Sequence, residues 1–366
     1  MQTMTDEEIK RAADFFTNEI AKLSSGKPLR LMEVCGTHTV AIFKAGIRQL
    51  LPENVELVSG PGCPVCVTQN EYLDTAIAYS RKSDVIIATF GDMLKVPGSS
   101  SSLAKEKAQG ADIRIVYSSI EALEIAVNHP AKKVIFLAVG FETTAPTAAA
   151  AVLMADEAKL ANFYVLSAHK LVPPALRALL TAGESHVDGF LLPGHVSAII
   201  GLKPYEFLSK EYNIPAVVAG FEALDILQSV YMLVRQIQNK TATLENQYSR
   251  IVQNDGNISA CNILSEVYQE ADAIWRGIGK ISNSGLVIRE KYQAFDALLN
   301  ISIVVEETKE AKGCQCGKVL RGLLLPADCL LFGKICKPEH PIGSCMVSVE
   351  GTCAAWYKYG AGRWQV

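Results

Sequence analysis

The sequence predicts an α/β protein in which two doubly wound parallel-sheet domains face a crevice and a loop-rich C-terminal domain follows them. Short runs of Val, Ile and Leu, bounded by Gly or Pro, alternate with segments of helical length, as in βαβ units. Polar or cysteine motifs follow most of these runs, and six of the ten cysteines lie from Cys314 onward. A chain of 366 residues with 49% hydrophobic content is long enough for two or three domains.

The apolar runs form two groups of four, with a boundary near residues 119–131. We therefore expect domains at residues 1–125, 126–245 and 246–366. Helices are expected between the strands, for example over residues 71–80 and 148–159, and an amphipathic helix is expected at residues 1–16. The predicted strands cover residues 29–35, 55–59, 84–90, 113–118, 133–139, 162–168, 189–192 and 214–219.

The composition argues against nucleic-acid and membrane partners. A net charge of -3 and a pI near 6.1 give no broad attraction for either surface. The first residues carry mixed charges where a signal peptide would be apolar, and no apolar run is long enough to span a bilayer. We therefore expect a cytoplasmic protein, in which clustered thiols serve metal binding or redox chemistry more often than structural disulfides.

The motifs at the carboxyl ends of the predicted strands are expected to meet in the crevice, where open α/β sheets place their ligand sites. Each residue alone has a structural explanation, since a cysteine or histidine there can belong to the core and Glu142 can accept a bond from a helix N-terminus. Their recurrence at equivalent strand ends favours a shared site. The residues are Cys35, His38, Cys63, Cys66, Glu142, His169 and His195.

Cys63 and Cys66 form a CxxC motif, whose two-residue spacer lets the sulfurs meet in a reversible disulfide or on a metal. The sequence from Thr68 to Glu71 has the pattern of a capping box, which places Cys66 just before a helix N-terminus. The helix dipole there favours a thiolate, so Cys66 is expected to be the more acidic thiol. The structural alternative is a Pro-Gly turn that holds two buried cysteines.

The six C-terminal cysteines lie in a segment rich in Gly and Pro, so short loops can bring several thiolates to one inorganic centre. A structural zinc site is the simplest alternative, but the run has no paired CxxC knuckles, and six thiols exceed the four that zinc needs. An iron-sulfur cluster with an adjacent redox pair uses all six. The spacing does not choose which four bind the cluster.

Five ordered motifs resemble those of the HypD family of hydrogenase maturation factors. The resemblance extends from about residue 29 to the end, although Ala223 stands where the family has a proline, at a helix start. The motifs are EVCGTH (residues 33–38), GPGCPVC (60–66), GFETTAP (140–146), PGH (193–195) and GSCMVSVEGTC (343–353).

This resemblance implies a scaffold and redox protein that assembles the Fe(CN)2CO unit of nickel-iron hydrogenases with a HypC-type small chaperone and a HypE-type cyanide donor. It implies that Cys35 binds the iron that carries cyanide and CO, with His38 close by, and that Cys63 and Cys66 form a redox pair in the crevice. Glu142 and His195 are expected in the same crevice.

The resemblance also implies a C-terminal domain similar to ferredoxin-thioredoxin reductase. By this analogy Cys314, Cys329, Cys336 and Cys353 bind a 4Fe-4S cluster, and Cys316 and Cys345 form an adjacent disulfide. Two other functions stay open, a general iron-sulfur thiol-disulfide oxidoreductase and a zinc-binding interaction module. The sequence does not decide whether the chain turns over as an enzyme alone.

Overall fold

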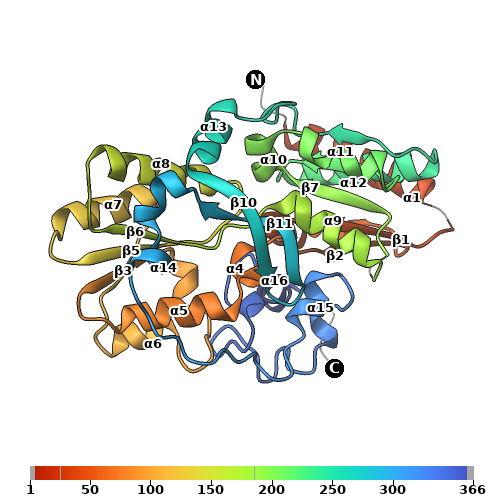
Figure 1. The fold of residues 1–366 in the computed structure, drawn as a ribbon. Coiled ribbons are helices and arrows are strands. Elements are labelled where there is room, and N and C mark those ends of the chain that lie inside the picture. Colours follow the sequence, from red (N-terminus) through yellow and green to blue (C-terminus); the bar gives the residue numbers. More distant parts are fainter. Residues whose placement is uncertain (1–4, 25, 185, 361–366) are drawn as a thin grey trace.

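The computed structural model describes residues 5–24, 26–184 and 186–360, and it contains two parallel sheets (Figure 1). Their strands are β1 (Leu29–Glu33), β2 (Val55–Ser59), β3 (Val85–Thr89), β4 (Ile113–Ile115), β5 (Lys133–Ala138), β6 (Phe163–Ser167), β7 (Gly189–Pro193), β8 (Ala216–Ala219) and β9 (Leu244–Asn246). The first sheet has the order β2-β1-β7-β8-β9 and the second has the order β4-β3-β5-β6. The predicted α/β class with two parallel sheets is therefore confirmed.

Each sheet combines strands from distant parts of the chain. In the first sheet β1 pairs with β7, and Leu31 lies opposite Gly189. In the second sheet β3 pairs with β5, and Val85 lies opposite Lys133. The strand order thus does not follow the expected division at residue 125. Local apolar patterns indicate where strands lie, but they do not indicate which strands pair with each other.

The two faces of each sheet contribute to different cores, as the alternation of side chains along a strand requires. In β1, Leu31 packs with Val230 in an outer core, whereas Met32 belongs to the central core. In β3, Ile86 and Ile87 divide in the same way between an outer core and the central one. The inner faces of both sheets therefore share one core, and the C-terminal cysteines join it.

Helices cover the outer faces. α1 packs with α12 on the first sheet, and α7 packs with α8 on the second. The helices are α1 (Asp6–Leu23), α2 (Gly36–Lys44), α3 (Ile47–Leu50), α4 (Pro64–Val67), α5 (Asn70–Ser80), α6 (Leu103–Ala108), α7 (Ser119–Asn128), α8 (Ala145–Glu157), α9 (Val172–Ala182), α10 (Gly194–Ile200), α11 (Glu206–Lys210), α12 (Ala223–Gln238), α13 (Ile258–Val267), α14 (Ala297–Asn300), α15 (Cys316–Leu320) and α16 (Thr352–Tyr359).

A β-hairpin of β10 (Tyr268–Trp275) and β11 (Gly279–Ile288) crosses between the two sheets (Figure 1). The sequence analysis missed it, because several β10 side chains are polar and exposed and give no buried apolar run. After the hairpin the chain runs through loops and short helices, as expected for the C-terminal part.

Several local predictions can be compared directly with the helices. The first helix begins at Asp6, and residues 1–4 of the expected segment lie outside the described residues. α5 and α8 occupy the two segments for which helices were predicted. The predicted capping box is wrong, because Thr68 Oγ1 donates to the Pro64 carbonyl (2.8 Å) and α5 begins after Gln69. Among the described helices, none has the length and apolar character that a membrane crossing requires.

Candidate functional site

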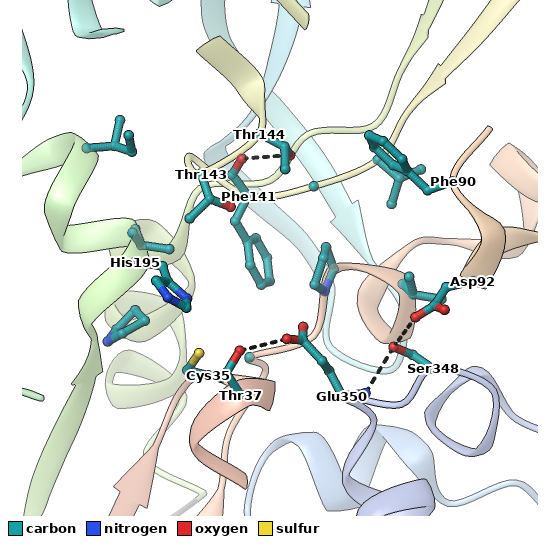
Figure 2. A pocket seen from close by; sticks show the side chains of 18 of the residues that line it. Cys35, Thr37, Phe90, Asp92, Phe141, Thr143, Thr144, His195, Ser348 and Glu350 are labelled. Atoms are coloured by element: carbon teal, nitrogen blue, oxygen red, sulfur yellow. Dashed lines mark hydrogen bonds between the residues drawn. The ribbon is translucent and has the colours of Figure 1, made fainter. Parts of the chain in front are cut away.

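A cavity of about 570 Å³ lies where the carboxyl ends of strands from both sheets converge, and we call it the crevice. It is lined by Cys35 after β1, Asp92 after β3, Phe141 after β5 and His195 after β7 (Figure 2). The geometry follows from parallel strands, whose carboxyl ends lie at one edge of each sheet. The predicted crevice between the two sheets is therefore present.

Cys35 ends the segment after β1 and forms the N-cap of α2, with its sulfur on the crevice (Figure 2). Burial raises the pKa of this thiol to about 12; the amide of His38 acts in the opposite direction, and the carboxylates of Glu350 and Glu33 raise the pKa further. The thiol is thus protonated at pH 7. A metal ion that binds it must displace that proton.

Two residues that the sequence analysis did not select hold Cys35 in place. Glu33 accepts hydrogen bonds from Cys35 N (3.2 Å) and Thr39 Oγ1 (2.6 Å), and burial raises its pKa to about 7. Gly36 N donates to Gly62 O (2.9 Å), and a Cβ at Gly62 would lie 2.3 Å from Cys35 N. The first two motifs therefore pack directly on each other, and glycine is required at position 62.

Glu350, another residue that was not selected, brings the C-terminal segment to the crevice. Thr37 Oγ1 donates to Glu350 Oε1 (2.7 Å), and Glu350 N donates to Ser348 Oγ (3.2 Å). Ser348 Oγ in turn donates to Asp92 Oδ2 (2.8 Å), as Figure 2 shows. This chain of bonds connects α2 with the end of β3. The sequence signal that could have identified Glu350 is a carboxylate between Cys345 and Cys353, within a motif that was considered only for its cysteines.

The two predicted histidines occupy different environments. Both rings stack on Phe221, with centroid distances of 3.8 Å for His195 and 4.6 Å for His38. His195 is exposed to the crevice; partial burial lowers its pKa, and Glu350 opposes this effect. His38 is buried, and burial lowers its pKa to about 4, so its neutral ring donates from Nε2 to Gly220 O (2.9 Å). His195 can thus contact a ligand in the crevice, whereas His38 is buried and packs against Phe221 and the Gly220 carbonyl behind the crevice wall.

Glu142 lines a second cavity of about 460 Å³ and is not among the residues that line the crevice. Its Oε1 accepts a bond from Val172 N (2.9 Å), and its Oε2 has no hydrogen-bond partner among the described residues. Burial raises the pKa of Glu142 to about 8, so the carboxyl is mostly protonated at pH 7. His169 is buried too, and burial lowers its pKa to about 3. These two strand-end residues therefore belong to the interior.

Cys63 and Cys66 lie behind the crevice wall, which the intervening Pro64 and Val65 line. Cys63 is the N-cap of the short helix α4, and its Sγ accepts a bond from Cys66 N (3.3 Å). Burial, together with the neighbouring thiols of Cys345 and Cys63, raises the pKa of Cys66. The expectation of an acidic Cys66 is therefore wrong, because this thiol lies in the core inside α4 and α5 begins only at Asn70.

Cys345 connects the CxxC motif to the C-terminal cysteines. Its sulfur is fully buried among the thiols of Cys316, Cys353 and Cys66, whose hydrogen bonds lower its pKa. The Cys66 thiol also donates to Ser344 O (3.9 Å), across 278 positions of sequence. A continuous row of thiols thus leads from the crevice wall toward the C-terminal loops.

Five of the six C-terminal cysteines line one small cavity. Cys314 Sγ lies 3.2 Å from Cys316 Sγ, and a Cβ at Gly343 would lie 2.6 Å from each sulfur. Among the described residues, no group of three His, Cys, Asp or Glu is arranged around a single metal ion. A 4Fe-4S cluster takes four thiolates around a wider cubane, and this all-thiol donor set fits it. The lining cysteines are Cys314, Cys316, Cys329, Cys336 and Cys353, without Cys345.

Comparisons with known proteins show which family of proteins this chain resembles over nearly its whole length. A family model for HypD, described as "Hydrogenase formation hypA family", matches residues 11–360. The chain is 45% identical over 351 residues to hydrogenase maturation factor HypD2 of Bradyrhizobium diazoefficiens, covering 94% of this chain and 92% of that protein. It is similar to HypD of Rhodobacter capsulatus (45% over 356 residues, 94% of each chain) and of Escherichia coli (46% over 334 residues, 91% and 90%).

Proposed function

Because this chain belongs to the HypD family of hydrogenase maturation factors, we propose that it assembles the Fe(CN)2CO unit of nickel-iron hydrogenases with Cys35 as the iron ligand. The iron with its cyanide and CO ligands is the cargo of the reaction. The observation that carries the proposal is the position of Cys35, the one cysteine among the described residues that line the crevice. Soft thiolate sulfur suits iron that carries cyanide.

The surroundings of Cys35 favour a bound metal over a free thiolate. Burial keeps the free thiol protonated, so a thiolate at this site requires a positive partner. The amides at the start of α2 stabilise that thiolate once it forms, as does the end of the helix dipole. Iron held by a single protein thiolate is open to further ligands, and this supports a HypC-type chaperone that closes the crevice and a HypE-type donor that delivers cyanide.

The row of thiols behind the crevice supports a redox role for Cys63 and Cys66. A donor that carries cyanide on sulfur, as R–S–CN, needs two electrons to release cyanide and R–S⁻. Oxidation of the two thiols to a disulfide supplies these electrons and releases two protons, one of which the R–S⁻ group can take up. Cys345 lies next to Cys66 and can exchange thiol for disulfide with it.

The C-terminal cysteines support the supply of electrons for this step. By the family analogy we assign the cluster ligands to Cys314, Cys329, Cys336 and Cys353, four of the five cysteines that line the small cavity. A bound 4Fe-4S cluster supplies electrons one at a time. Cys345 lies next to Cys66 and to Cys316, which lines the same cavity, so Cys316 and Cys345 are placed to form the redox pair that is reduced and then reduces the CxxC motif.

Infrared spectroscopy of the chain purified with its small chaperone tests the iron site. The wild-type complex should show cyanide and carbonyl stretches, and the Cys35→Ala variant should lose both while it keeps the visible absorbance of the cluster. Cys261, which lies outside the crevice and the cysteine cavity, offers the matched control Cys261→Ala. Unchanged infrared bands in the Cys35→Ala complex would contradict the assignment.

Iron analysis of anaerobically purified variants tests the assignment of the C-terminal cysteines. Cys329→Ser removes a cluster ligand and should lower iron and sulfide together, because one iron loses its thiolate. Cys345→Ser removes no iron bond, so it should keep the cluster spectrum and lose maturation activity. A Cys345→Ser protein without iron, or a Cys329→Ser protein with a full cluster, would reverse these roles.

The thiol row also favours a second candidate, a general iron-sulfur thiol-disulfide oxidoreductase. That function predicts reduction of unrelated protein disulfides without a dedicated chaperone. The hydrogenase-specific function predicts no such turnover, so an assay with an unrelated disulfide substrate separates the two.

A further inference from the structure

The tip of the β10–β11 hairpin contacts the chain segments that follow the CxxC motif and Cys316. Arg276 N donates to Val67 O (2.8 Å), directly after the CxxC motif, and Trp275 forms a bridge with Thr68. The Trp275 ring is fully buried and stacks on Phe141 of the crevice wall, with 6.0 Å between centroids. The hairpin tip is thus attached to both the crevice and the CxxC segment.

The same tip packs on the Cys314-Gln-Cys316 segment with backbone against backbone. A Cβ at Gly277 would lie 2.4 Å from Gly317 Cα, and a Cβ at Gly317 would lie 2.5 Å from Gly277 O. Gly277 also has a φ of +75°, which favours glycine. Neither residue can be larger without moving the tip, so the position of Arg276 relative to the cysteines is fixed.

The Arg276 side chain is a buried cation with incomplete compensation. Arg276 is 6% exposed, and its Nε lies 3.6 Å from Oε2 of Glu310. The Glu310 side chain is itself 65% exposed. Its Nη1 is buried and has no hydrogen-bond partner among the described residues. Burial of a charge without full pairing is costly, so such a residue requires an explanation.

The neighbouring thiols provide the explanation. Arg276 directly precedes Gly277, whose backbone packs on Gly317, the residue after Cys316. The buried guanidinium therefore lies beside the Cys314-Gln-Cys316 segment, where it can stabilise negative charge on a thiolate sulfur. In a poorly solvated site this effect is much larger than in water.

We propose that Arg276 is a positioning residue that holds a fixed positive charge beside the C-terminal cysteine centre and raises its reduction potential. The inference rests on the proposed 4Fe-4S cluster. When the cluster takes up one electron, the centre gains one negative charge, and a nearby cation stabilises the reduced form more than the oxidised form. Charge near a cluster is one of the established determinants of its potential.

The test is a potentiometric titration of the full-length protein with its cluster, followed by electron paramagnetic resonance of the reduced state. Arg276→Gln should shift the midpoint potential downward, and Arg276→Lys, which keeps a charge, should shift it less. Glu310→Gln removes the opposing carboxylate and should shift the potential upward. Lys280→Gln is the matched control, because Lys280 lies on the same hairpin but is exposed and paired with Asp272.

The opposite signs for Arg276→Gln and Glu310→Gln would support an electrostatic role, since a purely structural role would not produce them. An Arg276→Gln protein with full iron content and the wild-type potential overturns the proposal and leaves the cluster assignment intact. If the Arg276→Gln protein does not fold, the midpoint potentials of Glu310→Gln and Arg276→Lys test the proposal instead. Wild-type potentials in both of these variants would overturn the proposal. A wild-type chain that holds no iron and sulfide refutes the cluster and this proposal together.

Discussion

Replacement of Glu142 by Gln should make the protein less sensitive to alkaline pH. Burial raises the pKa of this carboxyl from 4.5 to about 8 in the folded chain. Between these values the folded state holds a proton that the unfolded state has released, so the free energy of unfolding falls as the pH rises. One pKa unit corresponds to about 1.4 kcal/mol, which gives a loss of about 5 kcal/mol at pH 8.

The Glu142→Gln variant has no proton to lose, and its side-chain oxygen can still accept the bond from Val172 N. Its stability should match that of the wild type near pH 4.5 and exceed it by up to about 5 kcal/mol at pH 8. Urea unfolding at several pH values, with reductant present, measures this difference, and the exposed Glu157→Gln serves as control. A difference between wild type and variant that does not change with pH would refute the reasoning.

Three further predictions concern the contacts around the crevice and the thiol row. Gly62→Ala should cost about 1–3 kcal/mol and abolish maturation, because its Cβ would lie 2.3 Å from Cys35 N; Gly91→Ala, where the Cβ meets only Ile115 at 3.7 Å, should unfold at nearly the wild-type urea concentration. Thr37→Val removes the bond to Glu350 and should lower maturation activity, which Thr37→Ser should restore; equal activities would exclude a role for that bond. Mild oxidation of Cys63→Ser should trap a disulfide between Cys66 and Cys345, detectable by peptide mass spectrometry, and its absence would contradict the proposed thiol exchange.

The strands could be predicted because buried parallel strands are short continuous apolar runs, as residues 85–89 illustrate with five buried side chains. The pairing of the strands could not be predicted, since no local sequence pattern indicates that β1 pairs with β7. The β10–β11 hairpin was missed because its polar, partly exposed side chains resemble those of a loop.

The crevice could be predicted from topology, and Cys35 and His195 do line it. The sequence does not show in which direction a side chain just beyond a strand points. The positions of Glu142 and His38, which lie outside the crevice, could therefore not be predicted. Glu350 was missed because a loop residue far along the chain reaches the crevice only through tertiary packing.

The pairing of β1 with β7 has a consequence for biosynthesis. A ribosome that has completed β1 and β2 must still add the whole second sheet before β7 can join them. Contacts of such long range form slowly and late. The Cys35 site also needs Glu350, which accepts its bond from Thr37 across 313 positions of sequence. A nascent chain therefore cannot present the complete proposed iron site before Glu350 has been synthesised, and metal loading should begin only after that point.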